Sequence, residues 1–494
     1  MLVKSLNEIA PLIGERVPEA RKILGFLCKG KLEIMAIYDH FQEHVHPSVE
    51  AAAEAIPDMG LTSFKKYGAK LLVYLRQMVP MMIEPDDTAV ESIIYDNALV
   101  KILDVFRCRH TSRIVAESAY ERAIDLEQAA LALDAVKSLM RCTATLGGNR
   151  KKEFLDFWEI NKNLVEPVRI QQQVHDLALE NLSYKSNKKI VNKERLEYLK
   201  NIEVSLRPFV GNITSFPFHT NYYNLAFDYY FTSGLFTEAY SNILEGLNYL
   251  ETRPRISNEF IGLFHARLCY CCAMLAQYEK GEQHLKQSLQ HGEVGTINWF
   301  SSLEIGYYLY MRAGNTEKAA EIYLKATRHK KFINLSDATR ETWYIIGAYL
   351  HIRLAAAGKP IPKQFPIYKA TKFQNDISHY QFDKGGLNAA ALIAGLLLTH
   401  LEGQKDKIVD RIDALDKYRE RYLLEGHTPR TALLLKMYLL MARSGFQRRL
   451  YGEKLAEYKA ELAAIVPESF EWEIIPGEQM IEFMEQLEQP LAAR

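Results

Sequence analysis

The first side chains with the types and spacing for chemistry lie in the segment His40-Phe-Gln-Glu43-His44. If a helix runs through this segment, His40 and His44 lie one turn apart on the same face. Two imidazoles so placed can bind zinc, and the carboxylate of Glu43 can activate a zinc-bound water for hydrolysis. Zinc-dependent hydrolysis is therefore one hypothesis for this chain.

The order H-x-x-E-H resembles that of the inverted zinc peptidases. This resemblance implies a distant downstream Glu as the third zinc ligand, and Glu121 is the candidate for that position. The surroundings differ from that family, because no glycine-bearing segment follows the motif and no strands are predicted around it, whereas the peptidase fold contains a sheet. The chain has 14 histidines, so this spacing also arises by accident. We expect a solvated or partly packed helix face at these residues, and a zinc peptidase stays a remote alternative.

Cys269, Cys271 and Cys272 form the other cluster of reactive side chains. A cysteine nucleophile needs a base and an orienting partner, and no motif supplies them. We expect these thiols to pack as compact hydrophobes in a helical core. The sequence contains no glycine-rich phosphate loop, no dinucleotide fingerprint and no nucleophile elbow, so it predicts neither an enzyme nor a cofactor.

The charge balance limits the classes of partner. Lys and Arg together number 61, as do Asp and Glu, and this neutrality argues against a dedicated nucleic-acid binder. Basic clusters at Asn149–Lys152, Lys185–Lys193 and Arg328–Lys331 are expected to be solvated helix ends. The longest apolar run, Ala389–Thr399, is shorter than the ~20 residues that span a bilayer. We therefore expect no membrane contact, and the oligomeric state stays open.

Cysteine usage and the N-terminus predict the compartment. Six cysteines are few for 494 residues and are not spaced as a disulfide framework. The first ten residues lack the basic start and long apolar stretch of a secretory signal. We expect a cytoplasmic protein.

Hydrophobic periodicity predicts the fold class. Apolar residues recur at intervals of three and four along nearly the whole chain, as in amphipathic helices, and sustained alternation is hard to find. In the first half, helical stretches are expected near Phe64–Met82, Ala98–Arg107, Arg113–Tyr120, Leu126–Leu139 and Lys152–Leu164. The polar, basic segment Tyr184–Arg195 is expected to be a solvated connection. The pattern predicts an all-α protein.

Residues 220–352 contain an internal repeat in which apolar, small and aromatic residues return at the same offsets. The first unit is Tyr223-x-x-Ala226-Phe227-x-x-Tyr230, then Gly234, Phe236, Ala239 and Ile243. The second is His265-x-x-Leu268-Cys269-x-x-Cys272, then Ala276, Tyr278, Gly281 and Leu285. The third is Leu303-x-x-Gly306-Tyr307-x-x-Tyr310, then Gly314, Ala319 and Tyr323, and Trp343-x-x-Ile346-Gly347-x-x-Leu350 repeats the opening half. Each complete unit predicts two helices joined by a short turn.

This template resembles the tetratricopeptide repeat, in which a large residue, a Leu-Gly pair and a Tyr mark the first helix. The resemblance implies antiparallel helix pairs that stack into an α-solenoid with a concave groove. Small residues such as Gly281, Gly306 and Gly347 are expected to let neighbouring helices approach closely. Successive units start 42, 38 and 40 residues apart rather than about 34, so longer helices or turns are expected. Other antiparallel helix-pair repeats remain the alternative.

Composition and punctuation divide the chain into six regions. These are an N-terminal helical region (1–90), helical hairpins that resemble degenerate repeats (91–200), the repeat core (210–357), an irregular insertion (358–386), C-terminal helical repeats (387–466) and an acidic amphipathic tail or cap (467–494). In the C-terminal repeats, Gly403 and Gly445 are expected to be inter-helix turns. The last region has seven Glu and no Lys or Arg between Pro467 and Glu488, so it is expected either to cap the repeats or to be captured by a partner.

If the geometry of the resembled family applies, side chains one turn away from the packing stripe of each first helix line the groove. These are Asn221, Asn224, Asp228, Tyr270, Met274, Glu304, Tyr308, Arg312, Tyr344 and His351. Such a mixture of amide, aromatic and charged groups can bind an extended peptide or a helix. The alternative is a solvent-facing surface of a purely structural solenoid.

The sequence therefore predicts a non-catalytic scaffold or adaptor that binds another protein or a peptide. A regulator whose curvature or C-terminal segment responds to a bound ligand or peptide is the second hypothesis.

Overall fold

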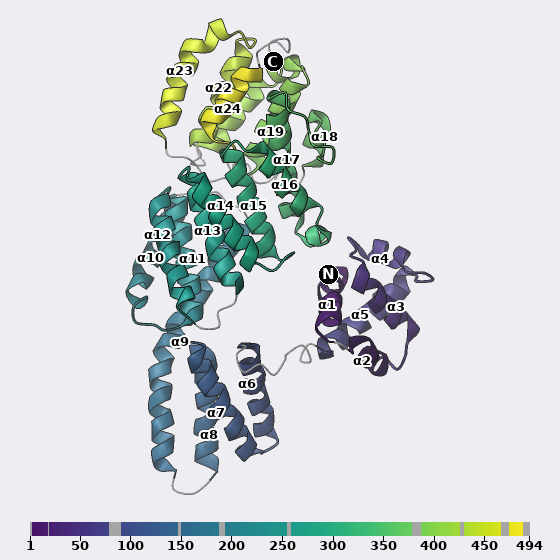
Figure 1. Ribbon diagram of the computed structural model, residues 1–494, viewed down its shortest axis with the longest axis vertical. Coiled ribbons are helices and arrows are strands. Elements are labelled where there is room, and N and C mark those ends of the chain that lie inside the picture. Colours follow the sequence, from purple (N-terminus) through teal and green to yellow (C-terminus); the bar gives the residue numbers. More distant parts are fainter. Residues whose placement is uncertain are drawn as a thin grey trace. The chain divides into compact units, whose positions relative to one another are not determined.

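The computed structural model describes residues 2–17, 19–78, 90–146, 150–186, 193–253, 258–377, 387–424, 429–465 and 474–487. Within these ranges all regular structure is helical, which confirms the predicted all-α class (Figure 1). None of the helices in the described ranges combines the length and the apolar character needed to span a bilayer. The chain forms two compact units, one of Met1–Gln173 with Ile213–Phe218 and one of Val174–Asn212 with His219–Arg494.

The first five helices surround a common core in the first unit. They are α1 (Leu2–Arg16), α2 (Ala20–Leu27), α3 (Leu32–Glu43), α4 (Val49–Ala55) and α5 (Leu61–Met78). Helix α5 contacts each of the other four. Its residues Phe64, Leu71, Leu75 and Met78 recur at helical spacing and are fully buried. This apolar stripe makes α5 the centre of the bundle.

A second group of helices in the same unit packs through alanine. Helices α6 (Val90–Val105), α7 (Arg109–Asp125) and α8 (Ala129–Thr145) contact one another in all three pairings. Ala119 and Ala123 of α7 and Ala132 and Ala135 of α8 are fully buried in one cluster. Short side chains at this contact let the two helix backbones come close.

Helix α9 (Lys151–Ser186) is much longer than the helix predicted near Lys152–Leu164, and it continues through Pro167. The division between the two units falls inside it, between Gln173 and Val174. The solvated connection predicted over Tyr184–Arg195 is shorter than expected, because α9 and α10 (Lys193–Leu206) extend into it from both ends. The Lys, Arg and Glu residues of this segment are good helix formers, so its polar character alone was not enough to predict a loop. Residues 187–192 lie outside the described ranges.

The second unit contains the helices predicted from the internal repeat, except for residues 216–218, which belong to the first unit. They are α11 (Phe216–Thr232), α12 (Phe236–Glu251), α13 (Asn258–Met274), α14 (Tyr278–His291), α15 (Ile297–Arg312), α16 (Thr316–Thr327) and α17 (Asp337–Ala356). The residues that open the four units, Tyr223, His265, Leu303 and Trp343, are all buried. Helices lie where the repeated pattern predicted them, and the residues that open the four units are buried, whereas Tyr230, Tyr278 and Tyr310 are partly exposed.

The three complete units share one turn geometry between their helices. Gly234, Ala276 and Gly314 have positive φ angles of 74°, 55° and 77°. The amide of the next residue then donates to a carbonyl five residues earlier: Leu235 to Tyr230 at 2.9 Å, Gln277 to Cys272 at 2.8 Å, and Asn315 to Tyr310 at 2.9 Å. This is the Schellman type of helix end. A non-glycine residue, Ala276, holds the left-handed conformation in the second unit.

Glycines occupy the close contacts between helices, as predicted. A Cβ atom at Gly306 would lie 2.7 Å from Leu285, and one at Gly281 would lie 2.6 Å from Leu309. A Cβ atom at Gly347 would lie 2.2 Å from the Tyr368 hydroxyl. Any side chain at these three positions would collide with a neighbouring helix or segment.

The remaining helices form the C-terminal part of the second unit. They are α18 (Ala370–Asp376), α19 (Leu387–Leu401), α20 (Lys405–Val409), α21 (Ile412–Tyr418), the π-helical turn η5 (Arg419–Leu424), α22 (Pro429–Arg443), α23 (Arg448–Ala464) and α24 (Gly477–Leu487). Turns with positive φ occur at Gly403 and Gly445, where the sequence predicted them.

The insertion predicted to be irregular over 358–386 contains the short helix α18. Ala370 and Phe373 of this helix are buried, and α18 packs against α19. Burial of Phe373 stabilises this helix, although the turn residues around it favoured an irregular segment. Residues 378–386, and 467–473 and 488–494 of the acidic region, lie outside the described ranges.

Candidate functional site

The histidines of the H-x-x-E-H motif are close in space but are not a pair on one helix. Helix α3 ends at Glu43, and His44 has an extended backbone. The His40 ring lies 4.6 Å from the His44 ring and stacks at 4.9 Å on His46, measured between centroids. Burial, with the neighbouring His44, lowers the pKa of His40. Among the described residues, Glu121 included, no three His, Cys, Asp or Glu side chains are arranged to hold a metal ion.

The cysteine cluster lies in the core, as predicted. Cys269, Cys271 and Cys272 are fully buried on α13, and none forms a disulfide. Burial raises the pKa of Cys272 to about 11 and that of Cys269 well above its ordinary value. These thiols are protonated at neutral pH and are poor nucleophiles.

The ten predicted groove residues fall into two sets of equal size. Asn221, Asn224, Tyr270, Glu304 and Tyr344 are partly exposed. Asp228, Met274, Tyr308, Arg312 and His351 are buried. Within the second unit, contacts from other segments of the chain cover several members of the buried set.

Asp228, on α11, lies at the centre of a buried polar network. Its carboxylate accepts hydrogen bonds from Asn181 at 2.7 Å and from Lys185 at 3.0 Å, both on α9, and Arg267 of α13 lies 3.5 Å away. Burial alone would raise the pKa of Asp228, but the two cations and the amide outweigh it, so this pKa is below its ordinary value. The C-terminal end of α9 therefore covers the first repeat unit at the place where the groove was predicted.

Two further side chains fasten α9 and α10 to this region. Arg195 of α10 donates to Glu180 and to Asn181 of α9, both at 2.8 Å. Glu203 of α10 accepts from the Tyr230 hydroxyl of α11 at 3.0 Å. The network holds two N-terminal segments of this unit against the first helix pair.

Helix α24 contacts the third repeat unit, at α15. The Gln479 side chain donates to the Arg312 carbonyl at 3.0 Å and accepts from Arg353 at 3.0 Å. Glu478 accepts from the buried Arg430 at 2.8 Å. The apolar face of α24, with Met480, Ile481 and Met484, is buried, and α24 contacts α17, α22 and α23.

Basic residues pair with the acidic side of α24. Glu485 lies 2.9 Å from Lys459 and 3.3 Å from Arg448, both on α23. Arg430 also donates to the carbonyls of Leu462 at 2.6 Å and Ile465 at 2.7 Å. Basic residues of α22 and α23 thus hold the acidic helix α24 within the same chain. The net charge of zero gives no sign of this pairing.

Aromatic side chains in the predicted groove also have partners within the chain. The Tyr270 ring lies 4.1 Å from Phe231. The Tyr344 hydroxyl donates to Asp376 of α18 at 3.1 Å, and its ring stacks on Phe373 at 5.5 Å. Tyr308 donates to Glu304 at 3.4 Å. The contacts of Tyr270 and Tyr344 hold their rings in place, which lowers the entropy cost of using the exposed edges of these two rings for binding.

A hydrogen-bonded chain of three side chains, which the sequence did not predict, links three helices of the first and second repeat units. The Tyr240 hydroxyl on α12 lies 3.2 Å from His284 Nε2 on α14, and His284 Nδ1 lies 3.1 Å from His265 Nδ1 on α13. Burial, with His284 and His291 nearby, lowers the pKa of His265 to about 4. Their separation of 19 residues and the different helices gave no local signal for this contact.

Comparison with known proteins returned no match: no family model, no curated protein and no solved structure matches the chain. The class that the described residues define is an all-helical protein.

Proposed function

We propose that this chain is a non-catalytic scaffold or adaptor that binds another protein, through a peptide or helix held in the groove of a tetratricopeptide-like α-solenoid. The observation that carries the proposal is the recurrence of one helix-turn-helix unit, with the same turn at Gly234, Ala276 and Gly314. Units of this kind stack through shared cores and leave one long face for a partner. A cytoplasmic setting accords with six cysteines that are all free thiols.

The partly exposed members of the predicted groove are the proposed binding surface. Tyr270 and Tyr344 supply aromatic area, and Asn221, Asn224 and Glu304 supply polar groups that orient a ligand. The end of α9 and helix α24 contact the predicted groove at Asp228 and Arg312. Because two helices of the same chain contact the predicted groove, we infer that its partner segment is also a helix, polar on one side and apolar on the other.

Affinity capture from the native source with mass spectrometry tests this proposal. The capture uses the full chain and a variant with Tyr270→Ala and Glu304→Lys. Lys286→Glu, at an exposed position of α14 outside the predicted groove, is the matched control. Thermal unfolding first establishes that both variants fold.

A partner retained by the wild type and Lys286→Glu, but lost from the groove variant, supports the proposal. A partner that binds all three forms equally, or the absence of any reproducible partner, contradicts it.

A regulatory role is the second candidate function, and the docking of α24 favours it. The Gln479 side chain of α24 donates a hydrogen bond to the Arg312 carbonyl in the third repeat unit. A ligand that binds Arg312 and Arg353 and also displaces the apolar face of α24 from α17, α22 and α23 would release this helix. Limited proteolysis with and without the captured partner tests this role, because release exposes α24 to cleavage.

The zinc-peptidase hypothesis has a direct test of its own. Metal analysis of the purified protein would support it only if stoichiometric zinc were present and were lost in His44→Ala.

A further inference from the structure

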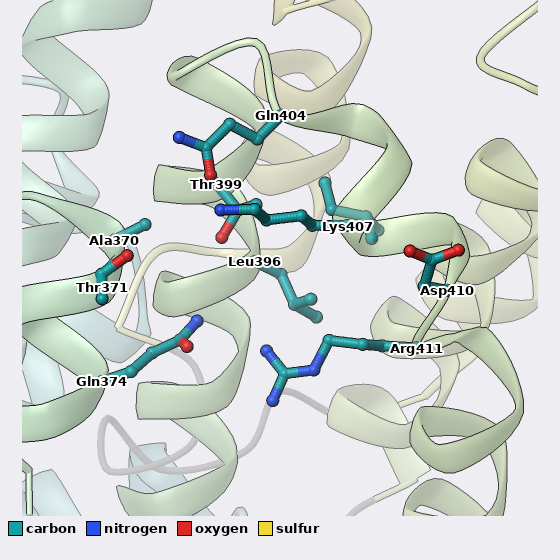
Figure 2. Close-up of a pocket in the computed structure, with 10 residues that line it drawn as sticks. Ala370, Thr371, Gln374, Leu396, Thr399, Gln404, Lys407, Asp410 and Arg411 are labelled. Carbon is teal, nitrogen blue, oxygen red and sulfur yellow. The ribbon is translucent and has the colours of Figure 1, made fainter.

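A cavity of about 270 Å³ opens among α18, α19 and α20, and none of the predicted groove residues lines it. Figure 2 shows Thr371 and Gln374 of α18 on one side, Leu396 and Thr399 of α19 behind, and the α20 segment opposite. Sites for drug-sized ligands have volumes of roughly 300–1,000 Å³, so this cavity suits a smaller molecule.

Two cations define the chemistry of this cavity. Lys407 and Arg411 lie four residues apart around the turn that joins α20 to α21, and both side chains extend into the open space (Figure 2). Neither forms an ion pair with any residue that the structure describes. Two cations that line one pocket repel each other. An anion between them would remove that repulsion and accept charge-assisted hydrogen bonds from both.

The nearby carboxylates leave this positive charge in place. Glu402 is engaged elsewhere, because it accepts from the Ala370 amide at 3.0 Å and from Gln404 at 3.3 Å. Asp410 lines the edge of the cavity, so two cations face a single carboxylate there. The balance favours a ligand with negative charge.

The other lining groups define the rest of the ligand. Thr371 and Gln374 make no side-chain hydrogen bond within the described part of the chain and are available as donors. The Thr399 hydroxyl already donates to the Gly395 carbonyl at 2.7 Å. Leu396 and Ile408 are buried and give the cavity an apolar floor. The floor suits a short carbon skeleton attached to a charged head.

We propose that this cavity binds a small organic anion, with a carboxylate or phosphate between Lys407 and Arg411 and with its carbon skeleton over Leu396 and Ile408. Thr371 and Gln374 donate to the remaining oxygens of the head group. The site is independent of the proposed protein-binding surface, because it shares no residue with the predicted groove.

Isothermal titration of the full chain tests the site with three probes: inorganic phosphate, succinate and glycerol. Ionic strength is held constant so that screening of surface charge does not change. The variants are Lys407→Gln, Arg411→Gln and the double substitution, with Lys417→Gln on the exposed side of α21 as the matched control. The unfolding midpoint of each unliganded variant is measured to establish that it folds.

Saturable binding of phosphate or succinate, with a dissociation constant on the order of 1 mM for such minimal probes, is the expected result. Whichever anion binds more tightly identifies the head group, and glycerol does not bind. Each single substitution weakens binding about 10-fold, the double substitution abolishes it and Lys417→Gln leaves it unchanged. Absence of saturable binding by both anions, or equal affinity in the folded double variant, would overturn the proposal.

Discussion

Replacing Gly347 by alanine tests whether close packing limits the stability of the second unit. The new Cβ atom would lie 2.2 Å from Tyr368 Oη and 2.7 Å from the Tyr323 ring. Both tyrosines are buried, and their hydroxyl groups share a hydrogen bond of 2.9 Å. Neither ring can move away without disturbing this hydrogen bond or the surrounding core.

The expected loss follows from three opposing contributions. Gly to Ala in a helix interior contributes about 1 kcal/mol of stability from backbone propensity. Overpacking a buried contact costs about 1–3 kcal/mol, and loss of the tyrosine hydrogen bond costs about 1 kcal/mol more. The net effect for Gly347→Ala is therefore a destabilisation of about 1–3 kcal/mol.

Gly452→Ala is the matched control for this substitution. Gly452 also lies inside a helix, α23, but no heavy atom lies within 4 Å of the Cβ position. Here only the propensity contribution remains, so we expect the protein to gain up to about 1 kcal/mol.

Thermal unfolding followed by circular dichroism measures both variants. Because about 1 kcal/mol shifts the midpoint of a large domain by a few degrees, the two substitutions should move it in opposite directions. A Gly347→Ala protein as stable as the wild type would refute the packing argument. A destabilised Gly452→Ala protein would show instead that helix propensity had been misjudged.

Three further predictions concern buried titratable groups. Acid lowers the free energy of unfolding of the second unit between pH 6.5 and about 4, because the unfolded chain protonates His265 first. Denaturant unfolding as a function of pH should show a shallower slope in His265→Gln, and a slope equal to that of the wild type would contradict this account. Arg430→Ala should lower the free energy of chemical unfolding by about 3 kcal/mol, because two backbone carbonyls and the Glu478 carboxylate lose their donor. Glu478→Gln changes a half-exposed partner and should lower the same free energy by less than about 1 kcal/mol, so equal losses in the two variants would contradict this account. Alkylation of the native protein should label the exposed Cys108 and spare Cys269, as peptide mapping would show, and rapid labelling of Cys269 would contradict the buried core.

The repeated units were predictable from the sequence because their signals are local. Apolar spacing within one helix identified the buried residues Tyr223, Leu303 and Trp343. Offsets of a few residues likewise located the turns at Gly234 and Gly314. Backbone geometry over one turn of helix depends on nearby residues, so a single sequence carries this information.

Other features were not predictable from local patterns. Nothing near α18 indicated that Phe373 would be buried and that a helix would form in the predicted irregular insertion. The segment after Tyr184 was polar enough to predict a loop, yet α9 and α10 extend into it. In both cases tertiary contact or helix propensity prevailed over a composition typical of connections.

The sequence by itself determined the helical class, the packing stripe and the turns, because these depend on side chains within about one helical turn of each other. Only the tertiary structure decided which polar residues would be covered. Asp228 is bonded by Asn181, 47 residues away, and the Arg312 carbonyl by Gln479, 167 residues away. The cavity between Lys407 and Gln374 likewise exists only where α18 and α20 meet α19. Such contacts depend on docking between distant segments, and the periodicity of a single helix carries no information about its partners.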